Sequence, residues 1–463
     1  MGSTVGELVA SARRAQAEYE KWNQQQIDDV VAAIAWTILE PESNRYLSQR
    51  AVEDTGLGDV DDKFQKNYRK TLGLLRDLTG APSVGIISED RERGIIEIAR
   101  PVGVVGAITP STNPVATPTN KVMNALKGCN AIILAPSPRG EAVCGELVAL
   151  FQQALKKVGA PEALVQKLPC PINKADTETL MREVDLVVAT GSQNNIRSAY
   201  SSGTPAVGVG AGNVSVIVDE TADLAAAAEQ IIASKTFDNA TSCSSENSVV
   251  ALDQVYDALV TALESQGAKM LTADEQESLQ QLMWTDGKLN PAVIAQPARE
   301  IAKRAGIHCE ADPGIKVLLV RESKTGPAHP FSGEKLCPVL TLYRAGDFDA
   351  ALAQVARIYD YQGAGHSVGI HTSDEKRAMR IALELPTCRV IVNQAHCFAT
   401  GGSFDNALPF SLSMGCGSWG GNSISDNMNY RHYLNTVRVV SRIPAQVVSP
   451  EDLLGDYWAR YGK

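Results

Sequence analysis

The sequence predicts an α/β protein built from two parallel β-sheets that are covered by helices. Short apolar segments alternate with helical segments both before and after residue 243. The short segments are apolar on both faces, which is typical of strands in a buried parallel sheet. Two other segments, 94–100 and 434–441, alternate polar and apolar residues. These two segments predict exposed strands that another subunit completes.

The chain begins with two predicted helices. Thr4 and Glu7 have the spacing of a capping box, and apolar residues follow at helical intervals as far as Trp22. The second helix is expected over 25–39. It ends before Pro41 because the residue before a proline disfavours helical backbone angles.

The alternating segments give the remaining elements in order. In the first unit we expect strands at 102–108, 131–134, 184–189 and 214–218, and helices at 115–126, 141–158 and 193–200. In the second unit we expect strands at 248–252, 316–320, 338–343 and 388–393, and helices at 253–264 and 374–383.

Composition excludes several classes of partner. The net charge is -10 and the pI is about 5.3, which argues against nucleic acid or an anionic membrane. No apolar run approaches the roughly 18 residues of a membrane span, and the N-terminus does not resemble a secretory signal. The nine cysteines form no disulfide framework and no zinc pattern. We therefore expect a cytoplasmic protein without a metal site.

Cys243 is the strongest candidate for a nucleophile. It lies among hydroxyl and amide side chains at 236–247, where the chain enters the apolar strand 248–252. A thiol on a loop that a strand holds in place is suited to attack a substrate. A small core residue is the alternative interpretation, but the other eight cysteines lack such polar surroundings.

Three turns after strands are candidate ligand contacts. Gly191 and Ser192 open the helix 193–200, whose free N–H groups could hold a diphosphate, although a plain turn is equally common. The glycines of 208–213 precede a strand rather than a helix, so they predict a tight turn close to a ligand. Asn113 could stabilise an oxyanion, although asparagine before proline is also an ordinary turn former.

Taken together, these segments resemble the aldehyde dehydrogenase family. The similarity is greatest to its CoA-acylating branch, which includes acylating succinate-semialdehyde and sulfoacetaldehyde dehydrogenases. It covers nearly the whole chain and rests on the motifs at 201–206, 208–213, 236–239 with Cys243, 334–339, 365–366 and 412–423.

The resemblance implies the aldehyde dehydrogenase fold, with two Rossmann-like units and a β-strand oligomerisation arm. Residues 1–86 and 104–236 would form the nicotinamide-cofactor-binding domain, and residues 237–425 the catalytic domain. Residues 87–103 and 426–463 would form the arm, which implies a homodimer or homotetramer.

The resemblance also assigns roles to single residues. Cys243 matches the catalytic thiol, and Asn113 matches the amide that holds the thiohemiacetal oxygen together with the Cys243 N–H. Glu334 matches the acid at the nicotinamide ribose. Gly191 and Ser192 match the turn over the cofactor diphosphate.

Residue 209 distinguishes the two branches of the family. Hydrolytic relatives carry a glutamate base where this chain has Val209. Because valine cannot take a proton, a thioester on Cys243 should persist until CoA accepts the acyl group. His366 could take the proton of the CoA thiol, since an imidazole titrates near neutrality. A structural histidine bonded to backbone is the alternative.

The choice between NAD and NADP stays open. The run 135–139 lacks the lysine and the acidic residue that many relatives use at the adenosine ribose. We expect Pro136, Ser137 and Arg139 at the cofactor, together with Gly210. Arg139 could pair with the 2'-phosphate of NADP, or it could be a surface arginine.

Hydroxyl groups around the thiol suggest the aldehyde. Thr241, Ser242 and Ser244 suit a short aldehyde with an anionic tail, unless they only shape the loop. We expect sulfoacetaldehyde first, then succinate semialdehyde and acetaldehyde. A hydrolytic aldehyde dehydrogenase and a non-catalytic protein of the same fold are the rival interpretations.

Overall fold

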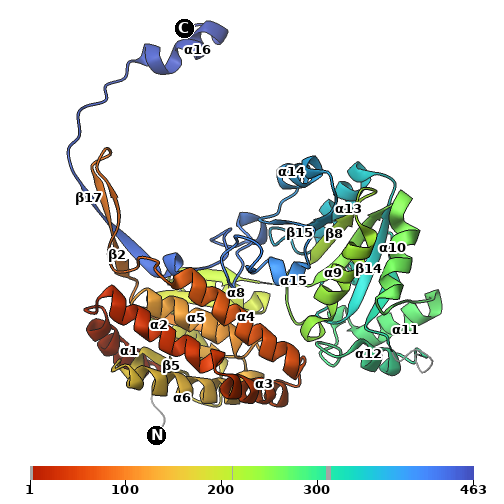
Figure 1. Ribbon diagram of the computed structural model, residues 1–463, viewed down its shortest axis with the longest axis horizontal. Helices are drawn as coiled ribbons and strands as arrows, with labels where there is room; N and C mark the ends of the chain where they lie inside the picture. The colour runs from red at the N-terminus through yellow and green to blue at the C-terminus, as the bar shows by residue number, and fades with distance from the viewer. Residues whose placement is uncertain (1–3, 211, 309–313) are drawn as a thin grey trace.

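The computed structural model describes residues 4–210, 212–308 and 314–463. It contains two parallel sheets in separate α/β units and a small antiparallel sheet that projects from one of them (Figure 1). Ala211, in the predicted glycine-rich turn, and Cys309 lie outside the described residues.

The first unit contains a five-stranded parallel sheet in the order β5-β4-β3-β6-β7. β3 and β4 are buried along their whole length, as the apolar sequence of both segments predicts. The strands are β3 (Val104–Thr109), β4 (Ala131–Pro136), β5 (Val165–Lys167), β6 (Leu186–Thr190) and β7 (Ala206–Val209).

Helices cover this sheet. The Thr4–Glu7 capping box starts the first of them, as predicted. Residues 41–78 form two helices, α3 and α4, for which the sequence analysis has no counterpart. α4 escapes detection because polar residues such as Lys63 and Lys66 are on its buried face. The helices are α1 (Val5–Tyr19), α2 (Gln24–Leu39), α3 (Pro41–Thr55), α4 (Val60–Leu78), α5 (Ala116–Lys127), α6 (Glu141–Lys157), α7 (Lys174–Glu183) and α8 (Gln193–Tyr200).

The second unit contains a seven-stranded sheet in the order β10-β13-β14-β9-β8-β15-β16, with every neighbouring pair parallel. The strands are β8 (Val214–Val218), β9 (Glu246–Leu252), β10 (Ala268–Met270), β13 (Val317–Arg321), β14 (Val339–Ala345), β15 (Val368–His371) and β16 (Val390–Val392). The helices are α9 (Leu224–Thr236), α10 (Asp253–Ser265), α11 (Ala273–Met283), α12 (Ala298–Arg304), α13 (Phe348–Tyr361), α14 (Glu375–Glu384) and α15 (His396–Ala399). A hairpin of β11 (Trp284–Thr285) and β12 (Lys288–Leu289) completes this unit.

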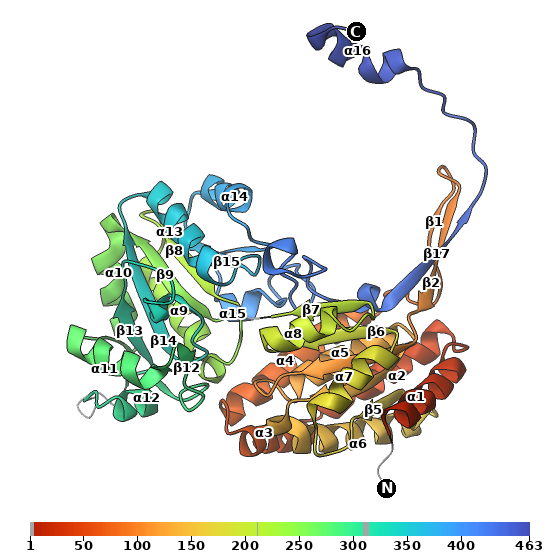
Figure 2. The same ribbon diagram turned by 180° about the vertical axis from the view of Figure 1, so that it is seen from behind.

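The boundary between the units differs from the predicted one at residue 236. β8 pairs with β9 and β15 of the second sheet, so β8 and the following α9 belong to the second unit. The chain therefore belongs to the first unit up to β7 and to the second unit from β8 onward (Figure 2). Gly208 and Val209 are the last residues of β7 rather than part of the predicted turn.

The two predicted exposed strands pair with each other. β2 (Ile95–Pro101) lies antiparallel between β1 (Gly85–Asp90) and β17 (Leu434–Val440). This three-stranded arm projects from the first unit in both views, and the chain then continues to α16 (Pro450–Tyr461), away from both units (Figures 1 and 2).

Candidate active site

Cys243 lies on a loop of unusual backbone geometry between α9 and β9. Just before it, Asp238, Asn239 and Ala240 all have positive φ angles, of 50°, 50° and 61°. Each such residue costs roughly 1–3 kcal/mol and persists only where its surroundings hold it. The loop that positions the thiol is therefore fixed by contacts outside itself.

The Asp238 carboxylate supplies those contacts. It accepts hydrogen bonds from Lys63 Nζ at 3.0 Å, Lys66 Nζ at 2.5 Å and Thr241 Oγ1 at 2.7 Å. Burial raises the pKa of Asp238, but the adjacent Lys66 and Lys63 ammonium groups outweigh it and hold that pKa below its ordinary value. α4 thus anchors the loop through a buried charged cluster.

Lys66 also orients Asn113. Its Nζ donates to Asn113 Oδ1 at 2.8 Å and to Thr241 Oγ1 at 3.0 Å. A lysine ammonium group only donates, so the amide oxygen must face Lys66. The amide nitrogen of Asn113 donates one weak hydrogen bond to Thr112 Oγ1 at 3.4 Å. Its second N–H can donate to a substrate oxygen.

A cavity of about 450 Å³ brings together most of the predicted residues, and we call it the catalytic cavity because it contains the candidate nucleophile Cys243. It lies at the carboxyl ends of β3 and β6, where parallel sheets bind ligands. The predicted residues that line it are Asn113, Ser137, Arg139, Gly191, Ser192, Gly210, Thr241, Ser242, Cys243 and Glu334.

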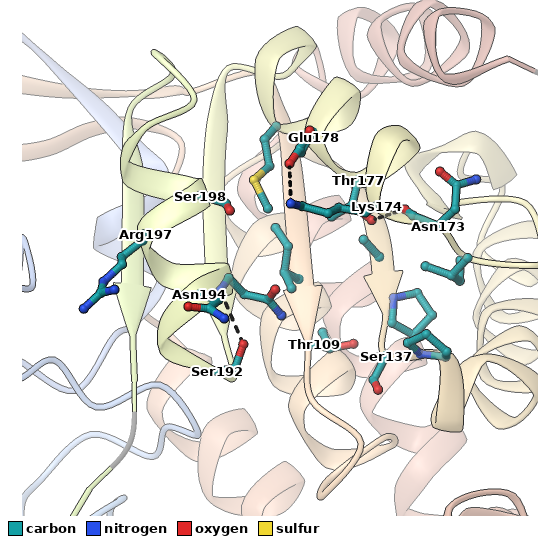
Figure 3. A pocket seen from close by; sticks show the side chains of 17 residues that line it. Thr109, Ser137, Asn173, Lys174, Thr177, Glu178, Ser192, Asn194, Arg197 and Ser198 are labelled. Carbon is teal, nitrogen blue, oxygen red and sulfur yellow. Dashed lines mark hydrogen bonds and ion pairs between the residues drawn. The ribbon is translucent and has the colours of Figure 1, made fainter. Parts of the chain in front are cut away.

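A long groove of about 670 Å³ continues from this cavity along the sheet edge. The two share Thr109, Ser137, Ser192 and Asn195. Figure 3 shows Ser192 and Asn194 at the start of α8 on one side of the groove and Asn173 and Lys174 on the other. Pro136 lines only this groove. Together the groove and the cavity suit an elongated ligand such as a dinucleotide.

The turn into α8 and the Glu334 carboxyl group both fit a nicotinamide nucleotide. Gly191 has a φ of 151°, which favours glycine, and Ser192 caps α8 by accepting from Asn195 N–H at 3.4 Å. The free N–H groups of such a helix start can bind a diphosphate. Glu334 Oε1 is buried without a hydrogen-bond partner, and burial raises the pKa of Glu334 to about 8. A ribose hydroxyl group would satisfy this oxygen.

The Cys243 thiol is protonated at rest. Burial raises its pKa to about 12, and the nearby Glu334 carboxyl group adds to the effect. The backbone at Gly212 packs tightly on this residue, because a Cβ there would lie 2.3 Å from the Cys243 carbonyl oxygen. A new positive charge in the cavity would favour the thiolate.

The structure does not bring His366 or Ser244 into the lining of the catalytic cavity. His366 is 1% exposed, and its Nδ1 hydrogen-bonds Ser367 Oγ at 2.7 Å. Burial lowers its pKa to about 3, with Arg389 contributing. Ser244 is buried, and its hydroxyl group bonds that of Ser242 at 2.8 Å. Ser244 therefore shapes the loop, which was the alternative interpretation.

A second, smaller cavity of about 30 Å³ lies on the other side of Asn113 and Ser242. We call it the α4 pocket; its lining includes Lys66, Arg69, Lys70, Asn113, Phe237, Ser242 and Phe398. The cationic side chains of this pocket all come from α4. The sequence analysis predicted neither this helix nor the pocket. The available signal was the helical spacing of residues 63, 66 and 70, which on its own is typical of a solvated face.

The described residues contain neither a metal-binding cluster nor a membrane-spanning helix. Among residues 4–210, 212–308 and 314–463, no group of three or more His, Cys, Asp or Glu side chains could hold a metal ion. Within the same ranges, no helix is long and apolar enough to cross a membrane.

Known proteins are similar to this chain over nearly its whole length. Residues 2–405 match the model of the aldehyde dehydrogenase family. A sulfoacetaldehyde dehydrogenase (acylating) from Cupriavidus necator is 57% identical, over 99% of this chain and 93% of the relative. The crystal structure of an acetylating aldehyde dehydrogenase from Geobacillus thermoglucosidasius matches with a TM-score of 0.92 and 35% identity, over 96% of this chain and 98% of that one.

A further solved structure that is similar to this chain contains bound CoA. The propionaldehyde dehydrogenase of Rhodopseudomonas palustris, with bound CoA and an acylated cysteine, matches with a TM-score of 0.84 and 26% identity, over 95% of this chain and 97% of that one. The matches span the whole architecture of both units. The chain belongs to the aldehyde dehydrogenase family.

Proposed function

We propose that the protein is a CoA-acylating aldehyde dehydrogenase whose substrate is sulfoacetaldehyde. The reaction is sulfoacetaldehyde + CoA + NAD(P)+ to sulfoacetyl-CoA + NAD(P)H + H+. The observation that carries the proposal is one cavity that contains Cys243, Asn113 and Glu334 and opens into the long groove. The 57% identity with the Cupriavidus necator enzyme supports the substrate.

The first step is attack by Cys243 Sγ on the aldehyde carbon. The oxygen that gains the electron pair accepts hydrogen bonds from the Asn113 amide and the Cys243 N–H. Lys66 holds the amide in place for this role. When bound, the nicotinamide nucleotide would accept the hydride released as the C–H bond of the former aldehyde carbon breaks, and its positive ring would favour the Cys243 thiolate against the raised resting pKa. A thioester on Cys243 results.

The second step is transfer of the acyl group to CoA. The CoA thiolate attacks the thioester and Cys243 leaves as a thiolate. Val209 ends β7 and is 4% exposed; it offers no base that would activate water. We retain His366 as a candidate acceptor of the CoA proton because its Nε2 is buried without a partner. Burial lowers the pKa of His366 to about 3, which makes it a weak base in this structure.

NADP is the cofactor that the charges of the cavity and the adjoining groove favour. Arg139 is exposed and, within the described chain, forms no hydrogen bond or ion pair. The carboxyl group of Glu178, in the groove lining, is engaged by Lys174 at 3.5 Å. An unpaired arginine suits a 2'-phosphate, and the described lining of the groove offers no unpaired carboxylate that would repel one.

The arm and the cysteines support two further proposals. β17 leaves Val437, Val439 and Val440 exposed on a projecting strand, as expected for a homodimer or homotetramer. The eight described cysteines are all free, which fits a cytoplasmic enzyme.

An aldehyde panel tests the function. Sulfoacetaldehyde, succinate semialdehyde and acetaldehyde are each incubated with NADP+ or NAD+, with and without CoA, and the thioester product is measured by mass spectrometry. We expect sulfoacetyl-CoA as the main product. A hydrolytic enzyme would instead release free acid without CoA, and a non-catalytic protein would reduce neither nucleotide.

A further inference from the structure

The α4 pocket adjoins the place where the aldehyde carbonyl must lie. It shares Asn113, Ser242 and Leu412 with the catalytic cavity, while the long groove leaves that cavity on the β4 and α8 side. Asn113 is the oxyanion donor of the proposed reaction, so a substrate held there has its tail close to the α4 pocket.

The α4 pocket has more positive than negative charge. Lys66, Arg69 and Lys70 lie at helical spacing on one face of α4 and all line it. Lys66 is neutralised by Asp238. Lys70 donates to the carbonyl oxygens of Gly401 and Gly402, at 2.9 and 3.1 Å, and has no carboxylate partner in the described chain.

Arg69 is the cation left for a ligand. Within the described residues its guanidinium group forms no hydrogen bond and no ion pair, and it lies 5.2 Å from the centre of the Phe398 ring. Phe398 itself packs edge-on against Phe237, with 4.7 Å between ring centres. Stacking on a fixed ring holds a guanidinium group in place at little entropic cost.

We propose that Arg69 binds the anionic tail of the aldehyde and thereby selects the substrate. This inference rests on the proposed function. A guanidinium group presents parallel N–H donors that match a sulfonate or a carboxylate. The small size of the pocket and its contact with Asn113 favour a tail one methylene away from the carbonyl carbon, as in sulfoacetaldehyde, over the longer tail of succinate semialdehyde.

The test compares charged and uncharged aldehydes in one variant. Arg69→Gln removes the charge, and kcat/KM is measured with CoA for sulfoacetaldehyde, succinate semialdehyde, acetaldehyde and butyraldehyde. We expect a loss of roughly 10- to 100-fold for the preferred anionic aldehyde, the usual size for a hydrogen bond to a charged group. We expect the uncharged aldehydes to change less than about threefold, since they make no contact that depends on this charge.

A binding probe and a matched variant complete the design. Ethanesulfonate should compete with the aldehyde in the wild type and at least about tenfold more weakly in Arg69→Gln. Arg76→Gln makes the same change on the same helix, where Arg76 pairs with Asp77 outside the pocket, and should leave every rate unchanged.

Each failure has its own signature. If the wild type forms no acyl-CoA from any aldehyde, the proposed function is wrong. Equal losses on charged and uncharged aldehydes in Arg69→Gln, or unchanged inhibition by ethanesulfonate, would overturn the role of Arg69. The wild type could instead prefer succinate semialdehyde, with Arg69→Gln losing that preference. Arg69 would then bind a carboxylate, and the inference of a shorter tail would be wrong.

Discussion

The long groove and the α4 pocket meet the same catalytic cavity but are built differently. The groove is formed by strand ends, by α7 with the residues before it, and by the start of α8. The α4 pocket is formed by charged side chains of one helix packed on the catalytic loop. A ligand in the groove is bound mainly by backbone at strand and helix ends, whereas a ligand in the α4 pocket is recognised by individual side chains. Cofactor class and aldehyde choice are therefore separable.

Loss of the Cys243 thiol should give the largest effect, and the effect should be the same for every nucleotide and every aldehyde. Cys243→Ala removes the nucleophile, so turnover should fall by roughly 10⁴-fold or more. The melting temperature should stay within a few degrees, since the change leaves only a small cavity. Nicotinamide-nucleotide reduction and differential scanning fluorimetry measure the two quantities. Appreciable turnover in this variant would contradict a nucleophilic role for Cys243.

The amide at the junction should matter almost as much. Asn113→Ala removes one of two oxyanion donors, and kcat should fall by roughly 10²- to 10³-fold for every aldehyde, charged or not. Steady-state kinetics with sulfoacetaldehyde and acetaldehyde checks this. A loss confined to the charged aldehyde would place Asn113 in recognition of the anionic tail. It would contradict the assignment of tail recognition to the α4 pocket alone.

The buried charge behind the loop should affect stability and activity together. Asp238→Asn leaves Lys63 and Lys66 without their carboxylate, which should cost about 3–5 kcal/mol of unfolding free energy and lower kcat. KM for the nucleotide should not change, because the groove is formed elsewhere. Urea unfolding and steady-state kinetics measure these quantities.

The stability change should also depend on pH. Because the pKa of Asp238 is depressed in the folded state, its stabilisation is present above the unfolded value of about 3.9 and is lost as pH falls through the lower folded pKa. The difference in unfolding free energy between wild type and Asp238→Asn should shrink below about pH 4. A difference that is the same at pH 7 and pH 3 would show that the charge is not its source.

The smallest effect is expected at Arg139, which lines the catalytic cavity next to Ser137, a residue that the cavity shares with the groove. Arg139→Ala should raise KM for NADP+ by roughly tenfold, the value of one charged hydrogen bond, and leave KM for NAD+ unchanged. The preference for sulfoacetaldehyde should stay the same. Equal changes for both nucleotides would make Arg139 an ordinary surface residue.

The sequence predicts the groove better than the α4 pocket. The buried strands and the helix 193–200 follow from hydrophobic periodicity, and the cavity around Cys243, Asn113 and Glu334 follows from motifs. Hydrophobic periodicity fails for α4, because the N-terminal half of its buried face carries Lys63, Lys66 and Asn67, and apolar residues are buried only near its end. The left-handed backbone at 238–240 depends on partners about 170 positions away along the chain, and no local pattern reveals such contacts.

The central claim is that a thioester on Cys243 waits for CoA. Intact-protein mass spectrometry tests this directly: the enzyme is mixed with sulfoacetaldehyde and NADP+, and CoA is added afterwards. We expect one sulfoacetyl group on Cys243 before CoA is added and sulfoacetyl-CoA with an unmodified enzyme afterwards. Steady release of sulfoacetate without CoA, at the rate seen with CoA, would contradict the account.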